Sequence, residues 1–214
     1  MAVVVPAVLI LLPVVLVPIF RIVPPIGTHM IVTRLTEGPI DRDWVPFDDI
    51  ARVLVISVMV SEDARFCEHH GVDWGALEAV IDTPGGPTRG ASTIAMQTAR
   101  NLFLWQARSY VRKGLEIPLA LYGDFIWGKR REMEIYLNIA QWGPELFGIE
   151  AAARHYFGRS AADLTARQAA LLAVALPNPV HRNPSAPSAV MNRLARTVEA
   201  RARRAGAYIH CLYG

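Results

Sequence analysis

Two acidic residues follow an apolar run in the first third of the chain. Residues 53–60, VLVISVMV, carry no charge, and Glu62 and Asp63 come after them with one serine between. Such a run predicts a buried helix that ends with both carboxyl groups at the mouth of a cleft. Burial beside an apolar wall raises the pKa of a carboxyl group, which makes acid or base chemistry possible. Alternatively, the two acids are solvated residues that mark the end of a core helix.

A second cluster combines two cations with one acid in the segment RKGLE. Glu116 would lie one helical turn beyond Arg112 and Lys113. The ordinary interpretation is an intrahelical ion pair, which contributes about 0.3–0.5 kcal/mol. Positive charge also gathers at residues 129–131 and between residues 193 and 204. These groups would suit an anionic lipid or a phosphorylated substrate near a membrane surface.

A glycine-rich segment leads into a helix that carries polar residues. Residues 83–92, TPGGPTRGAS, hold two prolines and three glycines, so we expect a flexible loop that gates a substrate. Ser92 or Thr93 would cap the following helix. Polar side chains recur on it at spacings of three and four, namely Thr93, Gln97, Arg100 and Asn101. A polar stripe is usually a solvated face, whereas a glycine-rich loop before a helix N-terminus favours a bound anion.

Helix-start signals indicate which elements position these groups. Asp48 or Asp49 is expected to cap the helix over residues 53–60, with a phenylalanine before them packing back on it. Asp73 would cap a second helix. Because strand signals are scarce, we expect the domain from residue 46 onward to be mostly helical.

Further helices are predicted toward the C-terminus. Pro118 should bend the helix that carries RKGLE, and KRREMEIYLNIAQWG should form another helix. GIEAAARHYFG reads as a short helix closed by Gly158. Thr165 and Gln168 form a capping box for the next helix, and a basic helix is expected over residues 188–205.

The N-terminal residues are apolar enough to predict a membrane anchor. Residues 1–20 contain no charged side chain, and about 20 residues at ~1.5 Å each cross a hydrocarbon layer of ~30 Å. No small-residue cleavage site follows, so we expect residues 1–23 to be a retained transmembrane helix rather than a signal peptide. Residues 24–45, rich in proline and glycine at both ends, are expected to form an extended linker or an early strand pair.

Composition excludes several classes of protein. The chain has 214 residues and a net charge of +3, which is too mild to imply a nucleic-acid partner. Cys67 and Cys211 are too few and too far apart to predict a disulfide framework or a metal site, so we expect Cys67 to be a core thiol. His69 and His70 would point apart on a helix, which suits packing and hydrogen bonding better than metal ligation.

Four segments, in this order, resemble the signature blocks of the peptidoglycan glycosyltransferases: EDARFCEHHGVD, RGASTIAMQTARN, RKGLE and KRREMEIYLN. The match covers about residues 45–205. No transpeptidase domain follows, so we expect the monofunctional, biosynthetic type of peptidoglycan transglycosylase. The resemblance implies an all-α, lysozyme-like fold with a larger lobe and a membrane-facing jaw. The glycosyltransferase domain would span residues 46–206, behind the single transmembrane helix, and residues 207–214 would be a tail.

The resemblance also implies a reaction. The disaccharide of lipid II is joined to a growing glycan that is still attached to polyprenyl pyrophosphate, and the α-linkage becomes β-1,4. Glu62 would be the general base for the attacking hydroxyl. Arg112 and Lys113 would stabilise the departing pyrophosphate. Glu116, which matches the second essential glutamate, would orient these cations or a bound divalent ion such as Mg²⁺ or Mn²⁺.

Other site residues follow from the same blocks. The acceptor side would be shaped by Asp63, Phe66 and His69. The donor would be held by Ser92, Thr93, Gln97 and Arg100, with Lys129 near the phosphates and Asn138 supporting the cleft. Glu134 and Tyr136 match the fourth block as well, and a structural role suits them. The second block departs from the family pattern, because Ala91 replaces a glycine and Met96 replaces a glutamine.

The implied partners are lipid II, the nascent glycan strand, membrane lipid and other cell-wall synthesis proteins. The expected location is the inner membrane, with the catalytic domain on the periplasmic side. Two alternatives stay open. A lytic transglycosylase or muramidase protonates a sugar leaving group and has no evident need for Arg112 and Lys113. A catalytically silent, membrane-anchored scaffold would have no need for Glu62 and Glu116.

Overall fold

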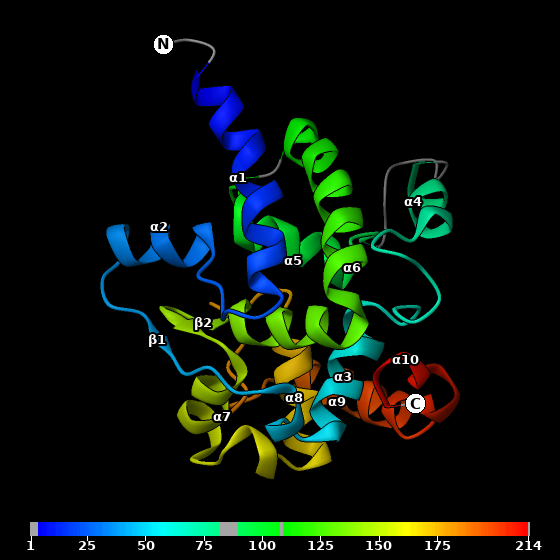
Figure 1. Cartoon of the computed structure of the whole chain (residues 1–214). Coiled ribbons are helices and arrows are strands. Elements are labelled where there is room, and N and C mark those ends of the chain that lie inside the picture. Colours follow the sequence, from blue (N-terminus) through cyan, green and yellow to red (C-terminus); the bar gives the residue numbers. More distant parts are fainter. Residues whose placement is uncertain (1–3, 82–89, 108, 214) are drawn as a thin grey trace.

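The computed structural model describes residues 4–81, 90–107 and 109–213, and helices dominate this part of the chain (Figure 1). The α-helices are α1 (Val4–Phe20), α2 (Thr28–Thr36), α3 (Arg52–Glu62), α4 (Trp74–Ile81), α5 (Ile94–Phe103), α6 (Tyr110–Ile139), α7 (Ile149–Phe157), α8 (Ala166–Ala175), α9 (Ala189–Ala202) and α10 (His210–Tyr213). Short 3-10 helices are η1 (Phe47–Asp49), η2 (Ala161–Asp163) and η3 (Ala205–Tyr208). The strands β1 (Asp41–Arg42), β2 (Gln141–Gly143) and β3 (Leu146–Phe147) form one sheet in the order β1-β3-β2. The expectation of a mostly helical chain is confirmed.

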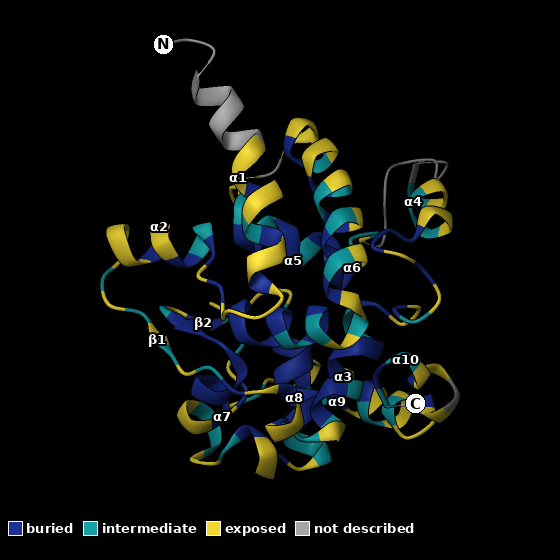
Figure 2. Cartoon of the chain, in the orientation of Figure 1, coloured by how far each residue is buried: buried dark blue, intermediate teal, exposed yellow. Residues whose placement is uncertain are grey.

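The larger core forms around α3 and α8. The apolar run of α3 is buried as predicted, with Leu54, Val55, Val58 and Met59 fully inaccessible to solvent. All seven residues of α8 from position 169 to 175 are buried too, four of them alanines. Small side chains on α8 let the two helices approach closely, and Figure 2 shows both deep inside the molecule. Helices α7, α9 and the second half of α6 complete this core, which fixes the C-terminal end of α3.

Helices α5 and α6 lie beside each other and share a smaller cluster of apolar side chains. Helix α6 is interrupted at Gly128, whose φ of 68° lies in the left-handed region that glycine adopts readily. The predicted separation of the RKGLE helix from the KRREMEIYLN helix is therefore confirmed. The break between the two helices is at Gly128 and not at Pro118, which lies at the surface within α6. A surface proline leaves the unpaired carbonyl of the preceding turn open to solvent, so the helix continues through it.

Helix caps are predicted well in most cases. Thr93 and Ser188 cap α5 and α9, and Thr165 with Gln168 forms the capping box of α8. Gly158 ends α7 in a left-handed conformation, and Asp73 accepts a hydrogen bond from the Ala76 amide at 3.0 Å.

The expected cap of α3 is wrong. Asp48 and Asp49 lie in η1, and α3 begins after Ala51 without a side-chain cap. Ile50 is in an extended conformation, so neither aspartate can reach the first turn of α3. Phe47 does pack into the same core as α3.

The expected linker over residues 24–45 contains a helix, α2, and is thus wrongly predicted. The proline and glycine residues stand on either side of α2 rather than inside it, and nine residues between them suffice for a helix. Gly27, just before α2, lies against α5, where an added Cβ would be 2.3 Å from the Asn101 carbonyl oxygen. Its lack of a side chain lets α2 start beside α5.

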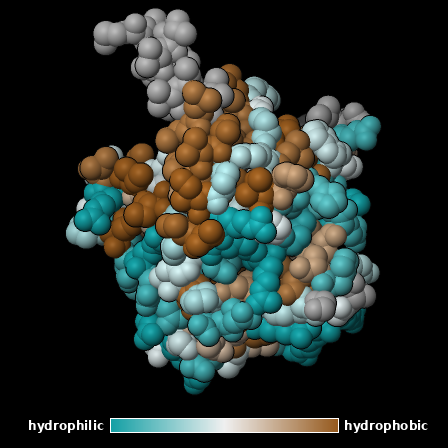
Figure 3. Space-filling model, viewed as in Figure 1, coloured by the Kyte–Doolittle hydropathy of each residue, from teal (hydrophilic) through white to brown (hydrophobic). Residues whose placement is uncertain are grey.

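Helix α1 lies against α6 and leaves apolar side chains exposed. Tyr122 donates a hydrogen bond to the Val14 carbonyl at 3.0 Å, and Trp127 Nε1 donates to the Val17 carbonyl at 2.7 Å. Leu11 and Val15 remain 60% and 59% exposed, and Figure 3 shows apolar atoms gathered over α1 and α2. Within the described residues, no helix combines the length and apolar character needed to cross a membrane.

The C-terminal segment is anchored to the domain by a disulfide. Cys67 and Cys211 are bonded, with Cα atoms 5.4 Å apart across a sequence separation of 144 residues. The expectation of a free core thiol at Cys67 is therefore wrong. Ile209 and Leu212 are buried in the larger core, so residues 207–213 are an integral part of the fold rather than a loose tail. Sequence distance concealed the pairing because only the folded chain brings the two cysteines together.

Candidate active site

Glu62 is the last residue of α3 and faces α5. Its Oε2 accepts a hydrogen bond from Gln97 Nε2 at 3.2 Å, and the Ser61 hydroxyl lies 3.4 Å from Oε1. Burial raises the pKa of Glu62, and these two hydrogen bonds oppose the rise in part. Glu62 also lines a hollow of about 200 Å³ together with Ser92 and Thr93. A carboxylate in this setting is a better proton acceptor than a solvated one.

Asp63 ties the turn after α3 to the start of α5. Its Oδ1 lies 2.9 Å from Nε2 of the buried His69, and its Oδ2 accepts a hydrogen bond from the Ile94 amide at 2.9 Å. The Thr93 hydroxyl donates to the Gly71 carbonyl at 2.6 Å. These bonds fix the first turn of α5 against the segment that carries Glu62.

The helix expected around His69 and His70 is not formed. The two residues belong to a turn, because Asp63 ends α3 with a non-helical φ of −156° and ψ of 75°, and Gly71 adopts a φ of 73°. His69 is buried against Asp63, whereas His70 is exposed with Nδ1 3.4 Å from Asp124. Their expected roles in packing and hydrogen bonding agree with these contacts.

The cation cluster lies at the start of α6, which Ser109 caps. Arg112 Nη1 is 2.6 Å from Glu116 Oε1, and Lys113 Nζ is 3.1 Å from Glu116 Oε2. The predicted ion pair is confirmed. Glu116 is only 1% exposed and Arg112 is buried, but the Lys113 side chain is 31% exposed. Lys113 is therefore the member of the cluster that an anionic ligand can reach.

The segment that leads into α5 joins this cluster to Glu62. Lys113 Nζ donates a hydrogen bond to the Ser92 hydroxyl at 2.7 Å and lies 3.8 Å from Met96 Sδ. Ser92 lines the same hollow as Glu62. The thioether of Met96, at a position where the resemblance leads us to expect a glutamine, is only a weak acceptor for Lys113.

Arg100 stands between the two acids. Its charge interacts with those of Glu116 and Glu62, and burial lowers its pKa. Within the described residues, the buried Nε of Arg100 has no hydrogen-bond partner. Arg100 also lines a second hollow of about 220 Å³ with Gln97 and Tyr136. Its guanidinium is thus placed to receive an anionic group.

Tyr136 orients the amide that contacts Glu62. Its hydroxyl donates to Gln97 Oε1 at 3.2 Å, which leaves Gln97 Nε2 to donate to Glu62. Burial raises the pKa of Tyr136 well above its usual value, so the hydroxyl stays a donor. The structural role expected for Tyr136 from the fourth block therefore includes positioning a site residue.

The predicted site residues separate into two groups. Those connected around the start of α5 are Glu62, Asp63, His69, Ser92, Thr93, Gln97, Arg100, Arg112, Lys113 and Glu116. Of the remaining three, Phe66 lies edge-on to His69, with ring centres 6.3 Å apart, whereas Lys129 and Asn138 have other surroundings. Phe66 is fully buried in the larger core. Asn138 is also buried and exchanges two hydrogen bonds of 2.9 Å with the backbone of Val45, so it holds the segment before η1.

Lys129 belongs to a buried charged cluster that the sequence did not reveal. Its Nζ lies 2.5 Å from Asp124 Oδ1 and 4.5 Å from the centre of the Phe66 ring. Glu132 is fully buried nearby, and burial raises its pKa well above the usual range, against the opposing charge of Lys129. The helical spacing could have indicated that Glu132 is buried beside Lys129. Glu132 lies three residues after Lys129 and four before Tyr136, on a helix with a buried face.

Glu116 is the acid that the resemblance assigns either to a divalent ion or to the neighbouring cations. Among residues 4–81, 90–107 and 109–213, no group of three or more His, Cys, Asp or Glu side chains could hold a metal ion. Both carboxylate oxygens of Glu116 are engaged by cations. Of the two functions expected for Glu116, the geometry supports the orientation of Arg112 and Lys113.

Comparisons with known proteins show the family of this chain. A family model described as Transglycosylase matches residues 29–203. The chain is similar to the biosynthetic peptidoglycan transglycosylase of Brucella suis, with 57% identity over 96% of this chain and 93% of that protein. Proteins of the same name from Agrobacterium fabrum and Rhizobium meliloti are 53% and 57% identical, over 95% and 88% of this chain and 92% and 81% of their own lengths. The chain belongs to the transglycosylase family.

Proposed function

We propose that this protein is a peptidoglycan glycosyltransferase that polymerises lipid II into β-1,4-linked glycan strands and releases polyprenyl pyrophosphate. The names of its relatives support this function. The observation that carries it is the junction at the N-terminal end of α5, where Gln97 in its first turn contacts Glu62 and Ser92, just before its cap, contacts Lys113. One short element thus holds a proton acceptor and a cation pair on either side of one reaction centre.

Glu62 takes the proton from the attacking 4-hydroxyl group of the acceptor. Its raised pKa makes it a stronger base than an ordinary glutamate. Gln97 keeps the carboxylate in place, and Tyr136 keeps the Gln97 amide in the required orientation. The deprotonated hydroxyl then attacks the anomeric carbon of the donor from the face opposite to the pyrophosphate, which inverts the configuration.

Lys113 and Arg100 stabilise the negative charge that develops on the departing pyrophosphate. Lys113 is the partly exposed member of its cluster, and Arg100 has a free buried N–H among the described residues. Fixed cations at the position of developing charge lower the barrier without reorganising during the reaction. Glu116 holds Arg112 and Lys113 in place.

Incubation with lipid II separates synthesis from the lytic alternative. The full chain is supplied with lipid II alone or with finished peptidoglycan alone, each with and without a chelator. A glycosyltransferase forms polymer from lipid II, and the chelator arm reports any need for a divalent cation. Release of fragments from finished peptidoglycan, with no polymer from lipid II, would establish the lytic activity instead.

The expected cellular location is part of the proposal. Residues 1–23 anchor the chain in the inner membrane, and the catalytic domain lies on the periplasmic side. Two features support this: the exposed apolar side chains of α1 and the disulfide between Cys67 and Cys211, a bond that persists in oxidising compartments. The apolar residues exposed on α2 extend the same surface.

Protease added to spheroplasts tests the location. The catalytic domain should be digested in spheroplasts and protected in intact cells, and removal of residues 1–23 should release the protein from the membrane fraction. Protection in spheroplasts until the membrane is lysed would place the domain on the cytoplasmic side.

A further inference from the structure

Helix α9 and the residue pair after it carry an excess of positive charge. Between residues 189 and 204 there are five arginines and one glutamate. Four of the arginines line one open hollow of about 440 Å³ together with Thr197 and Ala200. These four, which we call the α9 arginine face, are Arg193, Arg196, Arg201 and Arg204.

No acid among the described residues neutralises the arginines of this face. All four are exposed, and none forms an ion pair with a described residue. The one glutamate of α9, Glu199, pairs with Arg203, which lies outside the hollow. Like charges around one hollow repel each other, and a bound anion relieves that repulsion.

The α9 arginine face extends toward the candidate active site. Arg201 and Arg204 also line a neighbouring hollow of about 460 Å³, which reaches Ala64 and Arg65. Ala64 and Arg65 in turn form part of the wall of the hollow that contains Glu62. Three hollows therefore follow one another from Glu62 to Arg193, and neighbouring ones share wall residues.

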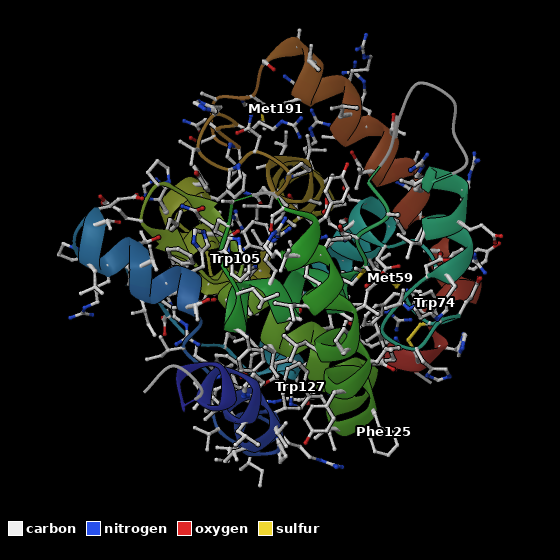
Figure 4. The ribbon with its side chains drawn as sticks, turned by 90° about the horizontal axis from the view of Figure 1, so that it is seen from above. Met59, Trp74, Trp105, Phe125, Trp127 and Met191 are labelled. Atoms are coloured by element: carbon white, nitrogen blue, oxygen red, sulfur yellow. A yellow bond between two sulfur atoms is a disulfide. The ribbon has the colours of Figure 1, made fainter. Side chains whose placement is uncertain are left out.

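The face lies far from the apolar surface of α1. In Figure 1, α1 is at the upper end of the molecule and α9 is in its lower half. In Figure 4, seen from above, α9 with Met191 and α1 are at opposite edges. An anion at this face is therefore on the aqueous side of a domain that rests on a membrane through α1, which argues against a lipid headgroup.

We infer that the α9 arginine face binds the nascent glycan strand, through the carboxylates of its peptides, as the strand leaves the Glu62 cleft. This inference rests on the function proposed above. A peptidoglycan strand carries carboxylates at regular intervals, and guanidinium groups bind carboxylates with two parallel hydrogen bonds. A row of such contacts retains the product between successive additions and so lengthens the strand.

The test measures strand binding apart from catalysis. The probe is soluble glycan released from peptidoglycan, with its peptides intact or with their carboxylates amidated. Arg201→Gln with Arg204→Gln removes the two arginines common to both hollows. We expect the double variant to bind intact strands roughly three- to tenfold more weakly. The amidated strands should bind the unaltered protein with a similar loss, and the variant should form shorter polymer from lipid II.

A matched double variant controls for the loss of charge. Arg154→Gln with Arg203→Gln also removes two exposed arginines, each paired with a glutamate and outside the three hollows. It should bind strands and set polymer length as the unaltered protein does. Thermal melting verifies that both variants are folded. Arg193→Gln with Arg196→Gln, farther from Glu62, should weaken binding of long strands more than of short ones.

Two results would overturn this inference. One is equal strand binding and equal polymer length in the unaltered protein and in Arg201→Gln/Arg204→Gln. The other is loss of binding to phosphatidylglycerol vesicles in that variant while strand binding is unchanged, which would make the face a lipid surface. Absence of any polymer from lipid II with the unaltered protein would instead contradict the proposed function, so the two failures can be told apart.

Discussion

Glu62 and Glu116 were predicted from the first and third blocks of one family pattern, yet their surroundings are opposite in kind. Glu116 is 1% exposed, and each of its oxygens is paired with a cation. Glu62 receives hydrogen bonds from an amide and a hydroxyl, and burial raises its pKa. An acid whose charge is balanced serves to hold its cations. An acid that is desolvated without a paired cation is ready to accept a proton.

Glu62→Gln should produce the largest effect, and on activity alone. Loss of a general base costs about 10²–10⁴-fold in rate, so lipid II polymerisation by the variant should fall by that factor. The melting temperature should stay equal or rise, because an amide is buried with less penalty than a carboxylate. Polymerisation at the normal rate in a folded variant would remove Glu62 from the mechanism and leave the scaffold alternative open.

Glu116→Gln should act chiefly on stability. The change leaves the buried Arg112 without its counter-charge, and breaking a buried pair costs about 3–5 kcal/mol. Denaturant unfolding of the variant should show this loss in the free energy of unfolding. Glu199→Gln is a matched control, because Glu199 and Arg203 have the same i, i+4 spacing and the Arg203 side chain is 72% exposed. It should cost no more than about 0.5 kcal/mol, and equal losses in the two variants would contradict the contrast.

Local signals predicted most of what local interactions decide. The caps at Thr93, Ser188 and Thr165 and the buried run of α3 follow from neighbouring residues, and the structure confirms them. Family blocks named the residues around α5. The pairing of Cys67 with Cys211 could not be predicted, because it depends on how the chain returns after 144 residues.

The environment of Lys129 was missed for a similar reason. The block resemblance placed it near the phosphates, whereas its described contacts are with Asp124 and Phe66. Asp124 comes before the break at Gly128 and Phe66 lies in a distant turn. Helical spacing could have indicated Glu132 beside Lys129, but only tertiary packing brings Asp124 and Phe66 to the same place.

Glu132 extends the comparison to a third buried acid. Unlike Glu116, it receives no hydrogen bond from a cation or an amide among the described residues, and its side-chain partner is another acid, Asp124. Burial raises its pKa well above the usual range, so the folded protein binds a proton that the unfolded chain releases more readily. Stability is therefore highest below the unfolded pKa and falls as the pH rises toward the folded pKa, by up to about 1.4 kcal/mol per pH unit.

Glu132→Gln should abolish this part of the pH dependence. Denaturant unfolding from pH 4 upward should show a smaller decline in the free energy of unfolding for the variant, which should be more stable than the unaltered protein at neutral pH. Glu132→Asp retains an ionisable group and should retain a decline. Parallel stability curves for the unaltered protein and Glu132→Gln would show that Glu132 does not titrate differently on folding.

Gln97→Ala should give the smallest effect and the finest test of the first comparison. The hydrogen bond from Gln97 opposes the rise in the pKa of Glu62, so its removal raises that pKa further. A base must be deprotonated to act, and the acid limb of the kcat/KM profile should therefore move to higher pH. Tyr136→Phe, which frees the Gln97 amide to turn, should move the limb in the same direction by less.

The control is Gln106→Ala, which removes an amide that contacts Asn101 rather than Glu62. Its kcat/KM profile should match that of the unaltered protein. An acid limb that stays in place in Gln97→Ala would mean that a group other than Glu62 titrates there. Glu62 would then not be the base that its contrast with Glu116 implies.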